Sequence, residues 1–536
     1  MTDQIIDVSG HFGAVPFARE SWTPADVVDR AAAVGITHTY VAALSGVYHE
    51  ASLGNADALA AAARHGELTA ASVVDPRSGS RSLDQVEESI DAGVRLFRAF
   101  RGAQGAWPPG EATFQAAARR IADAGLVLMA DLGNPIGELT EYMHALGDLD
   151  LTIVFANVTY ATLGEALTVM RTDPRVHLES HRLCHPDTLE LIASEVGADR
   201  VLFGTSGPPF NALSALNLVL HANLPEPDRR LILAGNALRL IEGREATDRA
   251  TPDLTPSPFG EPVRGPETVP IIDIHAHNGA WPYAGASSRE NHGITTLERL
   301  MTKYNVEQTF ASSALAITND FRRGNRELVE GSRGRGTIRP LVTITPHDVA
   351  GSCAEMDRWY PEPHVVGAKL HTQLSRVPIG DPRMAALFRE VAARGKPVVN
   401  HVMALGGFDP PTETQQVDGI AELASKHPEL PVVAYHGGGL DWERMLELAA
   451  PLTNLYVEYA SSWPQDNPVR AAVDRLGASR VMFGTDMDLL SPSLMVGLVD
   501  SAGLDPAAYA AVLHGNARRV FRLGPARSPQ GQAASG

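Results

Sequence analysis

Short apolar runs alternate with segments of helical periodicity along the second half of the chain. Near-continuous apolar runs are typical of parallel strands that helices cover on both faces. The clearest helical segments are residues 383–394 and 442–448. The predicted strands are residues 271–275, 308–312, 337–343, 365–369, 397–401, 431–436, 455–459 and 480–484. This order predicts an α/β fold of the TIM type, a (β/α)₈ barrel. An open doubly wound sheet is the alternative, but no Gly-x-Gly-x-x-Gly follows the first strand.

The chain also repeats itself. Residues 5–11 resemble 271–277, residues 201–206 resemble 481–486, and residues 235–240 resemble 515–520. The offset drifts only from 266 at Asp7 and Asp273 to 280 at Asn236 and Asn516. A period this long indicates a duplicated domain. We therefore predict two tandem barrels, residues 1–243 and 270–523, joined by a Pro-rich linker at 244–269 and followed by a disordered tail at 524–536.

Size and charge agree with this organisation. A barrel needs roughly 250 residues, and the chain has 536. The formal charge of −18 argues against a nucleic-acid partner. Cys184 and Cys353 lie in different halves and fit no metal-binding spacing. The first residues lack the pattern of a signal peptide, and no apolar run reaches membrane-spanning length. We expect a cytoplasmic protein that acts on a small molecule, away from membranes.

The candidate chemistry lies where the predicted strands of the second half end, which is where barrel active sites form. Strand one ends in His275-x-His277, and residues i and i+2 of a strand point to the same side. The remaining candidates are Lys369 and His371 on strand four, His401 on strand five, His436 on strand six, Glu458 on strand seven and Asp486 on strand eight. Imidazoles with one carboxylate suit zinc and related divalent ions.

The second half resembles the amidohydrolase-related family, in its one-metal branch of hydrolases, lactonases, hydratases and non-oxidative decarboxylases. The resemblance rests on residues 272–277, 367–371, 400–401, 435–439, 483–486 and 515–521. It implies one divalent ion, zinc first and manganese as the alternative, held by His275, His277, His401 and Asp486. It also implies a catalytic role for His436. Lys369 stands where the two-metal branch has a carboxylated lysine, which would bridge a second ion.

The first half keeps several residues that recur in both halves, but it lacks most of the metal-binding and catalytic residues that the family resemblance implies. His11, Glu179 and Asn236 persist opposite His277, Glu458 and Asn516. The expected replacements are Ser9 for His275, Arg95 for Lys369, Phe97 for His371, Asp131 for His401, Asn157 for His436 and Ser206 for Asp486. One histidine and a distant carboxylate hold a divalent ion poorly. The first barrel is therefore expected to be a pseudoenzyme domain without a metal.

Two reactions fit the candidate residues of the second half. In the first, His436 takes a proton from water activated by the metal, a carbonyl is attacked, and Asp486 passes a proton to the leaving group. In the second, the metal holds an aromatic or unsaturated acid and His436 protonates carbon during decarboxylation. Lys369, His371 or Arg289 would hold a substrate carboxylate. A non-catalytic scaffold is the third hypothesis, which the complete ligand set of the second half argues against.

The retained frame of the first half suggests a reason for its presence. Some members of the resembled family form homodimers in which one subunit lends a residue to the other's active site. We expect the two barrels to pack as an intramolecular pseudo-dimer, with further homo-oligomerisation open. Two independent barrels on a stiff tether are the alternative.

Overall fold

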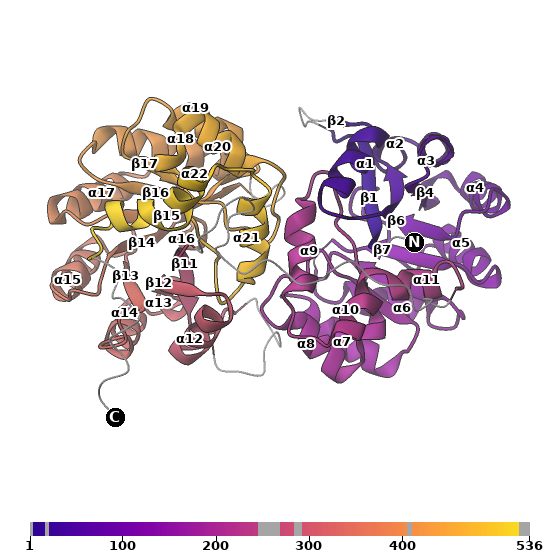
Figure 1. Cartoon of the computed structure of the whole chain (residues 1–536), viewed down its shortest axis with the longest axis horizontal. Helices are drawn as coiled ribbons and strands as arrows, with labels where there is room; N and C mark the ends of the chain where they lie inside the picture. The colour runs from indigo at the N-terminus through magenta and orange to yellow at the C-terminus, as the bar shows by residue number, and fades with distance from the viewer. Residues whose placement is uncertain are drawn as a thin grey trace.

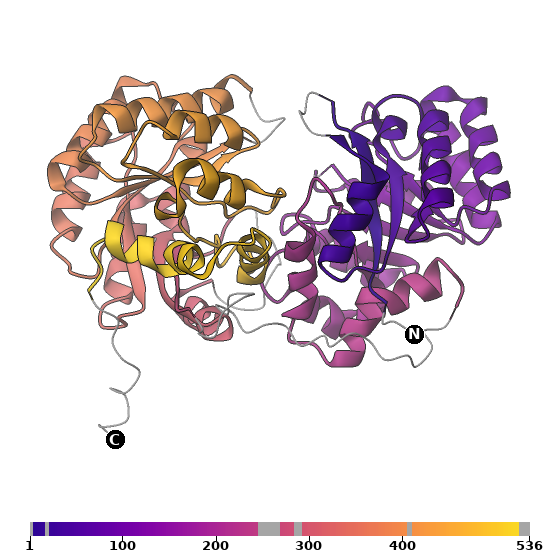
Figure 2. The same cartoon turned by 45° about the horizontal axis from the view of Figure 1, so that its top comes forward.

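The computed structural model describes residues 4–16, 21–133, 135–244, 269–282, 292–404 and 410–524. Most of the predicted linker and of the predicted tail lies outside these ranges, and so does Arg289. Figures 1 and 2 show two α/β units side by side, each with strands at its centre and helices around them. No helix among the described residues is long and apolar enough to cross a membrane.

Each unit is a (β/α)₈ barrel, as the sequence predicts. The parallel strands of the first barrel run in chain order. The third strand is divided at Ala71, whose N–H still donates to Val41 O on the second strand at 2.9 Å. Its strands are β1 (Ile6–Ala14), β3 (His38–Ala43), β4 (Leu68–Ala70), β5 (Ser72–Val74), β6 (Leu96–Ala99), β7 (Val127–Asp131), β8 (Thr152–Ala156), β9 (Val176–Glu179) and β10 (Val201–Leu202), with the short β2 (Ser21–Trp22) antiparallel to β1.

Helices follow the strands of the first barrel and cover its outer face (Figure 1). They are α1 (Pro24–Ala33), α2 (Leu44–Tyr48), α3 (Ala51–Arg64), α4 (Ser80–Asp91), α5 (Ala112–Asp123), α6 (Glu138–Leu146), α7 (Leu163–Thr172), α8 (Thr188–Glu195), α9 (Ala212–Leu220), α10 (Glu226–Arg230) and α11 (Asn236–Leu240).

The second barrel has its strands in the same order. They are β11 (Ile271–Asn278), β12 (Val306–Ser313), β13 (Ile338–Thr343), β14 (Gly367–His371), β15 (Val398–Ala404), β16 (Val432–Gly439) and β17 (Leu455–Val457). The eighth predicted strand is reduced to a bridge between Val481 and Val457, because its chain bends at once into the loop that carries Asp486. The Ile274 N–H donates to Phe483 O at 3.0 Å and closes the barrel.

The helices of the second barrel repeat the arrangement of the first. They are α12 (Ile294–Lys303), α13 (Ala314–Thr318), α14 (Phe321–Gly331), α15 (Val349–Trp359), α16 (Thr372–Ser375), α17 (Pro382–Arg394), α18 (Pro410–Lys426), α19 (Trp442–Ala449), α20 (Pro468–Leu476), α21 (Pro492–Asp500), α22 (Pro506–Ala510) and α23 (Asn516–Val520). Inside the barrel, a packed apolar cluster that includes Ile272, Phe310 and Val433 fills the part below the C-terminal ends of the strands. The polar side chains are thereby confined to the rim at the strand C-termini.

Equivalent hydrogen bonds hold the frame of both barrels. The Thr205 N–H donates to Asp7 Oδ1 at 3.0 Å, and the Thr485 N–H donates to Asp273 Oδ1 at 3.0 Å. Asn236 and Asn516 each donate two amide hydrogens to backbone carbonyls, one in the turn before strand eight and one on the first residue of that strand. Buried polar groups are costly without partners, so these bonds explain why the same residues recur in both halves.

The two barrels pack through equivalent helices. Helix α9 lies against α21, and each follows strand eight of its own barrel (Figure 1). The N-cap residue of each helix donates its backbone N–H across the interface: Asn211 to Pro464 O at 2.9 Å, and Ser491 to Cys184 O at 2.7 Å. Reciprocal bonds between equivalent elements are the pattern of an approximate two-fold contact. That the first barrel replaces a partner subunit stays a prediction.

Close approach of α9 and α21 yields a first prediction. An added Cβ at Gly497 would lie 2.8 Å from Ser214 Cα. Helix propensity alone would make Gly→Ala stabilising by roughly 1 kcal/mol. The close contact with Ser214 should instead make the substitution destabilising. We expect Gly497→Ala to lower the free energy of unfolding by about 1–3 kcal/mol, measured by urea denaturation. Gly102→Ala, where no atom lies within 4 Å of the added Cβ, is the control. A stabilised Gly497→Ala protein would contradict the close packing.

Candidate active site

The strand ends of the second barrel bring the predicted side chains to one buried cluster. His275 and His277 lie on β11, His401 on β15 and His436 on β16, and Asp486 follows strand eight. All five are at most 8% exposed. Their burial follows from the barrel geometry, because parallel strands with a common tilt deliver their C-terminal residues to the same rim.

Two imidazoles and one carboxylate form the centre of this cluster. His277 Nε2 lies 2.9 Å from Asp486 Oδ1, and His275 Nε2 lies 3.5 Å from the same oxygen. Potential ligand atoms of these three residues are all within 4.8 Å of one another. The pair on β11 therefore shares one side of its strand, as the His-x-His spacing predicts.

Partners on the other ring nitrogen orient both imidazoles. His275 Nδ1 lies 3.0 Å from Glu458 Oε2, and His277 Nδ1 lies 3.0 Å from Ser312 Oγ. Each ring consequently presents Nε2 to the centre. Metal-binding histidines depend on such partners for ring orientation and basicity. Sequence reasoning assigned no role to Glu458 or Ser312, although the recurrence of Glu179 opposite Glu458 was a signal for the first of them.

His401 joins the cluster without pointing its Nε2 to the centre. Its ring stacks on His371 at 3.9 Å and lies 4.4 Å from the His436 ring, measured between centroids. His401 Nε2 lies 3.0 Å from Gln373 Oε1. Among the described residues, the groups of converging ligand atoms include His275, His277, His436, Glu458 and Asp486 but not His401. Its role as a ligand therefore stays a prediction.

His436 is held by the backbone in a way that leaves one nitrogen available. Its φ is +67°, and its Nδ1 lies 2.5 Å from Ala460 O. A carbonyl oxygen only accepts hydrogen bonds, so Nδ1 carries the hydrogen and Nε2 keeps a lone pair. Gly437 follows with φ +56°, and a Cβ there would lie 2.2 Å from the Tyr459 ring. The glycines therefore form a tight backbone turn against Tyr459.

Of the predicted substrate-binding residues, Lys369 and His371 lie beside the cluster, whereas Arg289 is outside the described residues. Lys369 Nζ lies 3.5 Å from His275 Nε2 and 4.1 Å from the centroid of the Tyr435 ring. His371 lies near Trp281, at 6.5 Å between ring centroids, and Trp281 in turn lies 4.7 Å from His277. Trp281, which sequence reasoning missed, thus forms an aromatic wall of the site.

Burial dominates the electrostatics of this cluster. Desolvation lowers the pKa of Lys369 to about 7, against the opposing charges of Asp486 and Glu458. Desolvation also raises the pKa of Glu458 to about 8 and lowers that of His436 to about 4. The pKa of Asp486 is lowered in spite of burial, through its hydrogen bond to His277. The site therefore favours neutral imidazoles around one carboxylate, which is the donor set that a divalent ion requires.

Comparison with known proteins agrees with this geometry. Residues 6–242 and, again, residues 272–523 match the family described as Amidohydrolase. The chain belongs to the amidohydrolase family. Because both barrels match, the internal repeat is a duplication within that family. No curated protein matches the chain.

Three solved structures are each similar to about half of this amidohydrolase. A 5-carboxyvanillate decarboxylase from Sphingomonas paucimobilis is 18% identical, with 48% of this chain and 100% of that chain covered and a TM-score of 0.40. A 2,6-dihydroxybenzoate decarboxylase from Rhizobium is 16% identical, with 47% and 99% covered and a TM-score of 0.41. An uncharacterised TIM-barrel protein from Bordetella bronchiseptica is 17% identical, with 47% and 99% covered and a TM-score of 0.39.

Strand register corrects part of the predicted equivalence between the two amidohydrolase units. Asn55 brackets Val73 with two hydrogen bonds, as Asn325 brackets Thr343. Val73 pairs with Arg98, whereas Thr343 pairs with Lys369. Arg98 therefore replaces Lys369 and Phe100 replaces His371. The predicted equivalents, Arg95 and Phe97, were wrong by three residues, because the two halves are too dissimilar there for their sequences alone to fix the alignment of the strands.

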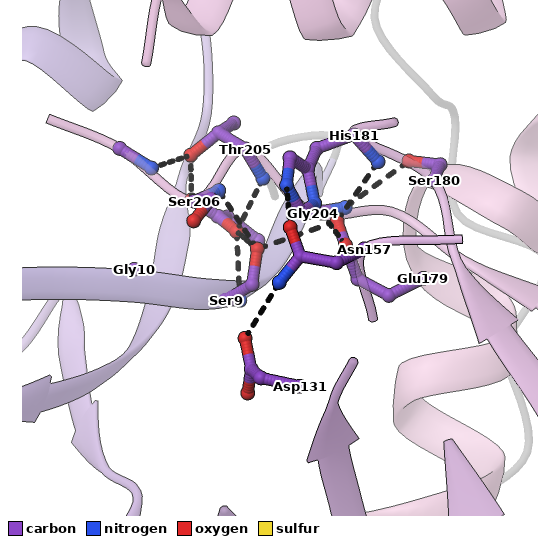
Figure 3. A network of polar contacts seen from close by, with 12 residues as sticks. Ser9, Gly10, Asp131, Asn157, Glu179, Ser180, His181, Gly204, Thr205 and Ser206 are labelled. Carbon is purple, nitrogen blue, oxygen red and sulfur yellow. Dashed lines mark hydrogen bonds and ion pairs between the residues drawn. The ribbon is translucent and has the colours of Figure 1, made fainter. Parts of the chain in front are cut away.

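Arg98 fills the space that corresponds to the second barrel's cluster. Its side chain is fully buried; Nη2 donates to Asp131 Oδ1 at 3.0 Å, and Nη1 donates to the carbonyl of Ser9 at 3.2 Å. Figure 3 shows Asn157 between Asp131 and His181, with Glu179 and Ser206 nearby. The Asn157 amide donates to Asp131 at 3.4 Å. An internal ion pair and its hydrogen bonds thus occupy the centre of the first barrel.

A metal prediction follows from this contrast. We expect the full-length protein to hold one divalent ion per chain after dialysis, and Asp486→Ala to lose most of it, because the remaining ligands hold an ion weakly. Ser206→Ala, at the equivalent place in the first barrel, should leave the content unchanged. Elemental analysis measures both. Two ions per chain would indicate a carboxylated Lys369 or an ion in the first barrel, and no stoichiometric ion would support a scaffold.

A stability prediction concerns the first barrel. Arg98→Met leaves the Asp131 carboxylate buried without its cation, and removing one partner of a buried pair costs about 3–5 kcal/mol. The double variant Arg98→Met/Asp131→Leu should be more stable than Arg98→Met alone. Urea denaturation of the full-length chain measures the difference. Equal stability of the single variant and the wild type would refute a central role for this ion pair.

Proposed function

We propose that the second barrel is a metal-dependent hydrolase that acts on a carbonyl group of a small molecule, such as an amide or a lactone. The observation that carries the proposal is the tautomer of His436. Its Nδ1 is committed to Ala460 O, and its Nε2 lone pair is therefore available to accept a proton. A neutral, positioned imidazole beside a candidate metal site is suited to general-base catalysis.

The residues present fit a divalent ion. Nε2 of His275, Nε2 of His277 and Oδ1 of Asp486 converge, and each imidazole is oriented by a partner on its other nitrogen. His401 would complete the set by turning its ring from Gln373. Such an ion supplies Lewis-acid polarisation of a carbonyl oxygen and lowers the pKa of water at the site. The histidine-rich set of ligands suits zinc, and its carboxylate is also compatible with manganese.

The chain's own residues would then carry the proton and hold the substrate. His436 Nε2 accepts the proton of the attacking water. The carboxylate of Asp486, which has a second oxygen besides Oδ1, would accept the second proton of that water from the tetrahedral intermediate and relay it to the leaving group. Lys369 and His371 lie on the β14 side of the cluster, where a substrate carboxylate would meet the ammonium group.

Decarboxylation of an unsaturated or aromatic acid is the second candidate. The position of Lys369 favours it, because its buried ammonium group makes no ion pair with a carboxylate among the described residues and would hold an acid beside the metal site. Reaction in water labelled with both ¹⁸O and deuterium separates the two: hydrolysis places ¹⁸O in the carboxyl product, whereas decarboxylation releases CO₂ and places deuterium on carbon.

The His436→Asn variant tests the assignment of the base. We expect it to keep its metal and to lose turnover by roughly 10²–10⁴-fold, as for removal of a general base. Asparagine is the residue that the first barrel carries at this place, Asn157. His347→Asn, an exposed position on the same barrel, is the control. The measurement pairs elemental analysis with steady-state rates on lactones and amides; a variant that loses its ion would make His436 a ligand instead.

A further inference from the structure

Arg182 of the first barrel is a buried cation without a hydrogen-bonding partner. It follows β9 and is 8% exposed. It makes no ion pair or hydrogen bond with any residue that the structure describes, and its buried Nε is unsatisfied. Burial lowers the pKa of its guanidinium group, which nevertheless stays protonated. An unpaired buried charge is expensive, so this arrangement calls for an anion from outside the chain.

The guanidinium group faces the second barrel. Its carbon lies 4.7 Å from the centroid of the Trp463 ring, and Trp463 is in the loop that follows Glu458. Two residues beyond Arg182, the carbonyl of Cys184 accepts the N–H of Ser491, in the loop that follows Asp486. Arg182 therefore lies between the strand-seven and strand-eight loops at the mouth of the second barrel.

A second residue of the first barrel reaches the same mouth. Tyr160, in the loop after β8, packs against the cluster of Trp281 and Ala314, as Leu489 also does. Trp281 contacts the His277 ring, and Leu489 is three residues beyond Asp486. Burial raises the pKa values of Tyr160 and Cys184, and the charge of Asp486 adds to both shifts. Loops six and seven of the first barrel thus border the site of the second.

We propose that Arg182 binds a carboxylate group of the ligand that enters the second barrel, so that the active site is shared between the two barrels. A planar guanidinium group matches a carboxylate in a bidentate pair. Trp463, whose ring lies against the same guanidinium group, is 36% exposed, so an entering ligand can reach this ring. The proposal rests on the proposed function only in taking this mouth as the place where substrate binds.

Reciprocal contacts make this role possible within one chain. The approximate two-fold contact of α9 with α21 places the strand-seven loop of each barrel against the strand-eight loop of the other. The first barrel has its own centre closed by Arg98 and Asp131, whereas the second keeps its cluster of histidines. The first barrel would therefore contribute a binding side chain to a neighbour whose chemistry it no longer has.

Binding of two matched probes tests the role of Arg182. The full-length, metal-loaded protein is titrated with 4-nitrobenzoate and with the neutral 4-nitrobenzamide by equilibrium dialysis. We expect the wild type to prefer the carboxylate, and Arg182→Met to weaken binding of the carboxylate roughly 10- to 100-fold, the worth of one charge-assisted hydrogen bond. Binding of the amide should not change. Arg119→Met, an exposed position on α5, removes the same charge elsewhere.

Stability gives an independent readout. Because Arg182 makes no ion pair or hydrogen bond with the described residues and Met can keep the apolar contact with Trp463, Arg182→Met should unfold at the same or a higher urea concentration than the wild type. Equal carboxylate affinity in both proteins, a wild type that does not distinguish the two probes, or a marked loss of stability in the variant would each overturn the proposal. If turnover survives His436→Asn while Arg182→Met still loses the carboxylate, the proposed reaction fails and the binding role stands.

Discussion

A buried carboxylate on the first strand of each barrel ties that strand to the loop after strand eight. In the second barrel Asp273 accepts the N–H of His275 at 2.9 Å and both the N–H and the hydroxyl of Thr485. Asp486 is the next residue along the chain, so the same carboxylate that closes the barrel also sets Asp486 beside His275 and His277. Desolvation raises the pKa of Asp273 to about 7, and its hydrogen bonds oppose that shift.

The same constraint explains how the first barrel could lose the metal-binding residues and keep its fold. Asp7 and Thr205 make the equivalent bonds there, independently of any ligand at the centre. Replacement of the histidines leaves the closure intact, but it removes the groups that would surround a cation. Arg98 provides a permanent cation in that place, and Asp131 neutralises it. The charge of this buried pair is therefore balanced within the first barrel itself.

Contact between the barrels brings loops of the first unit against loops of the second. The loops that carry catalytic groups in a barrel are also the loops that meet across this interface, since α9 and α21 both continue from strand eight. A side chain just outside one centre, such as Arg182, can therefore lie at the mouth of the other. Arg98 is paired with Asp131 inside its own barrel, whereas Arg182 lies against Trp463 of the second barrel.

The sequence by itself was enough to predict the duplication, both barrels and most of the residues at the second rim. Strand periodicity places His275 and His277 on one side, and barrel topology brings the ends of distant strands together, so neither inference needs coordinates. The identity of the ring nitrogen that faces the centre was decided by tertiary contacts, through Glu458 for His275 and Ser312 for His277. The equivalence of Arg98 with Lys369 also required the structure, because it depends on cross-strand register. Arg182 was invisible to sequence reasoning for the same physical reason: its lack of a partner and its position at the second mouth arise only when two barrels, each folded from its own local pattern, pack against one another.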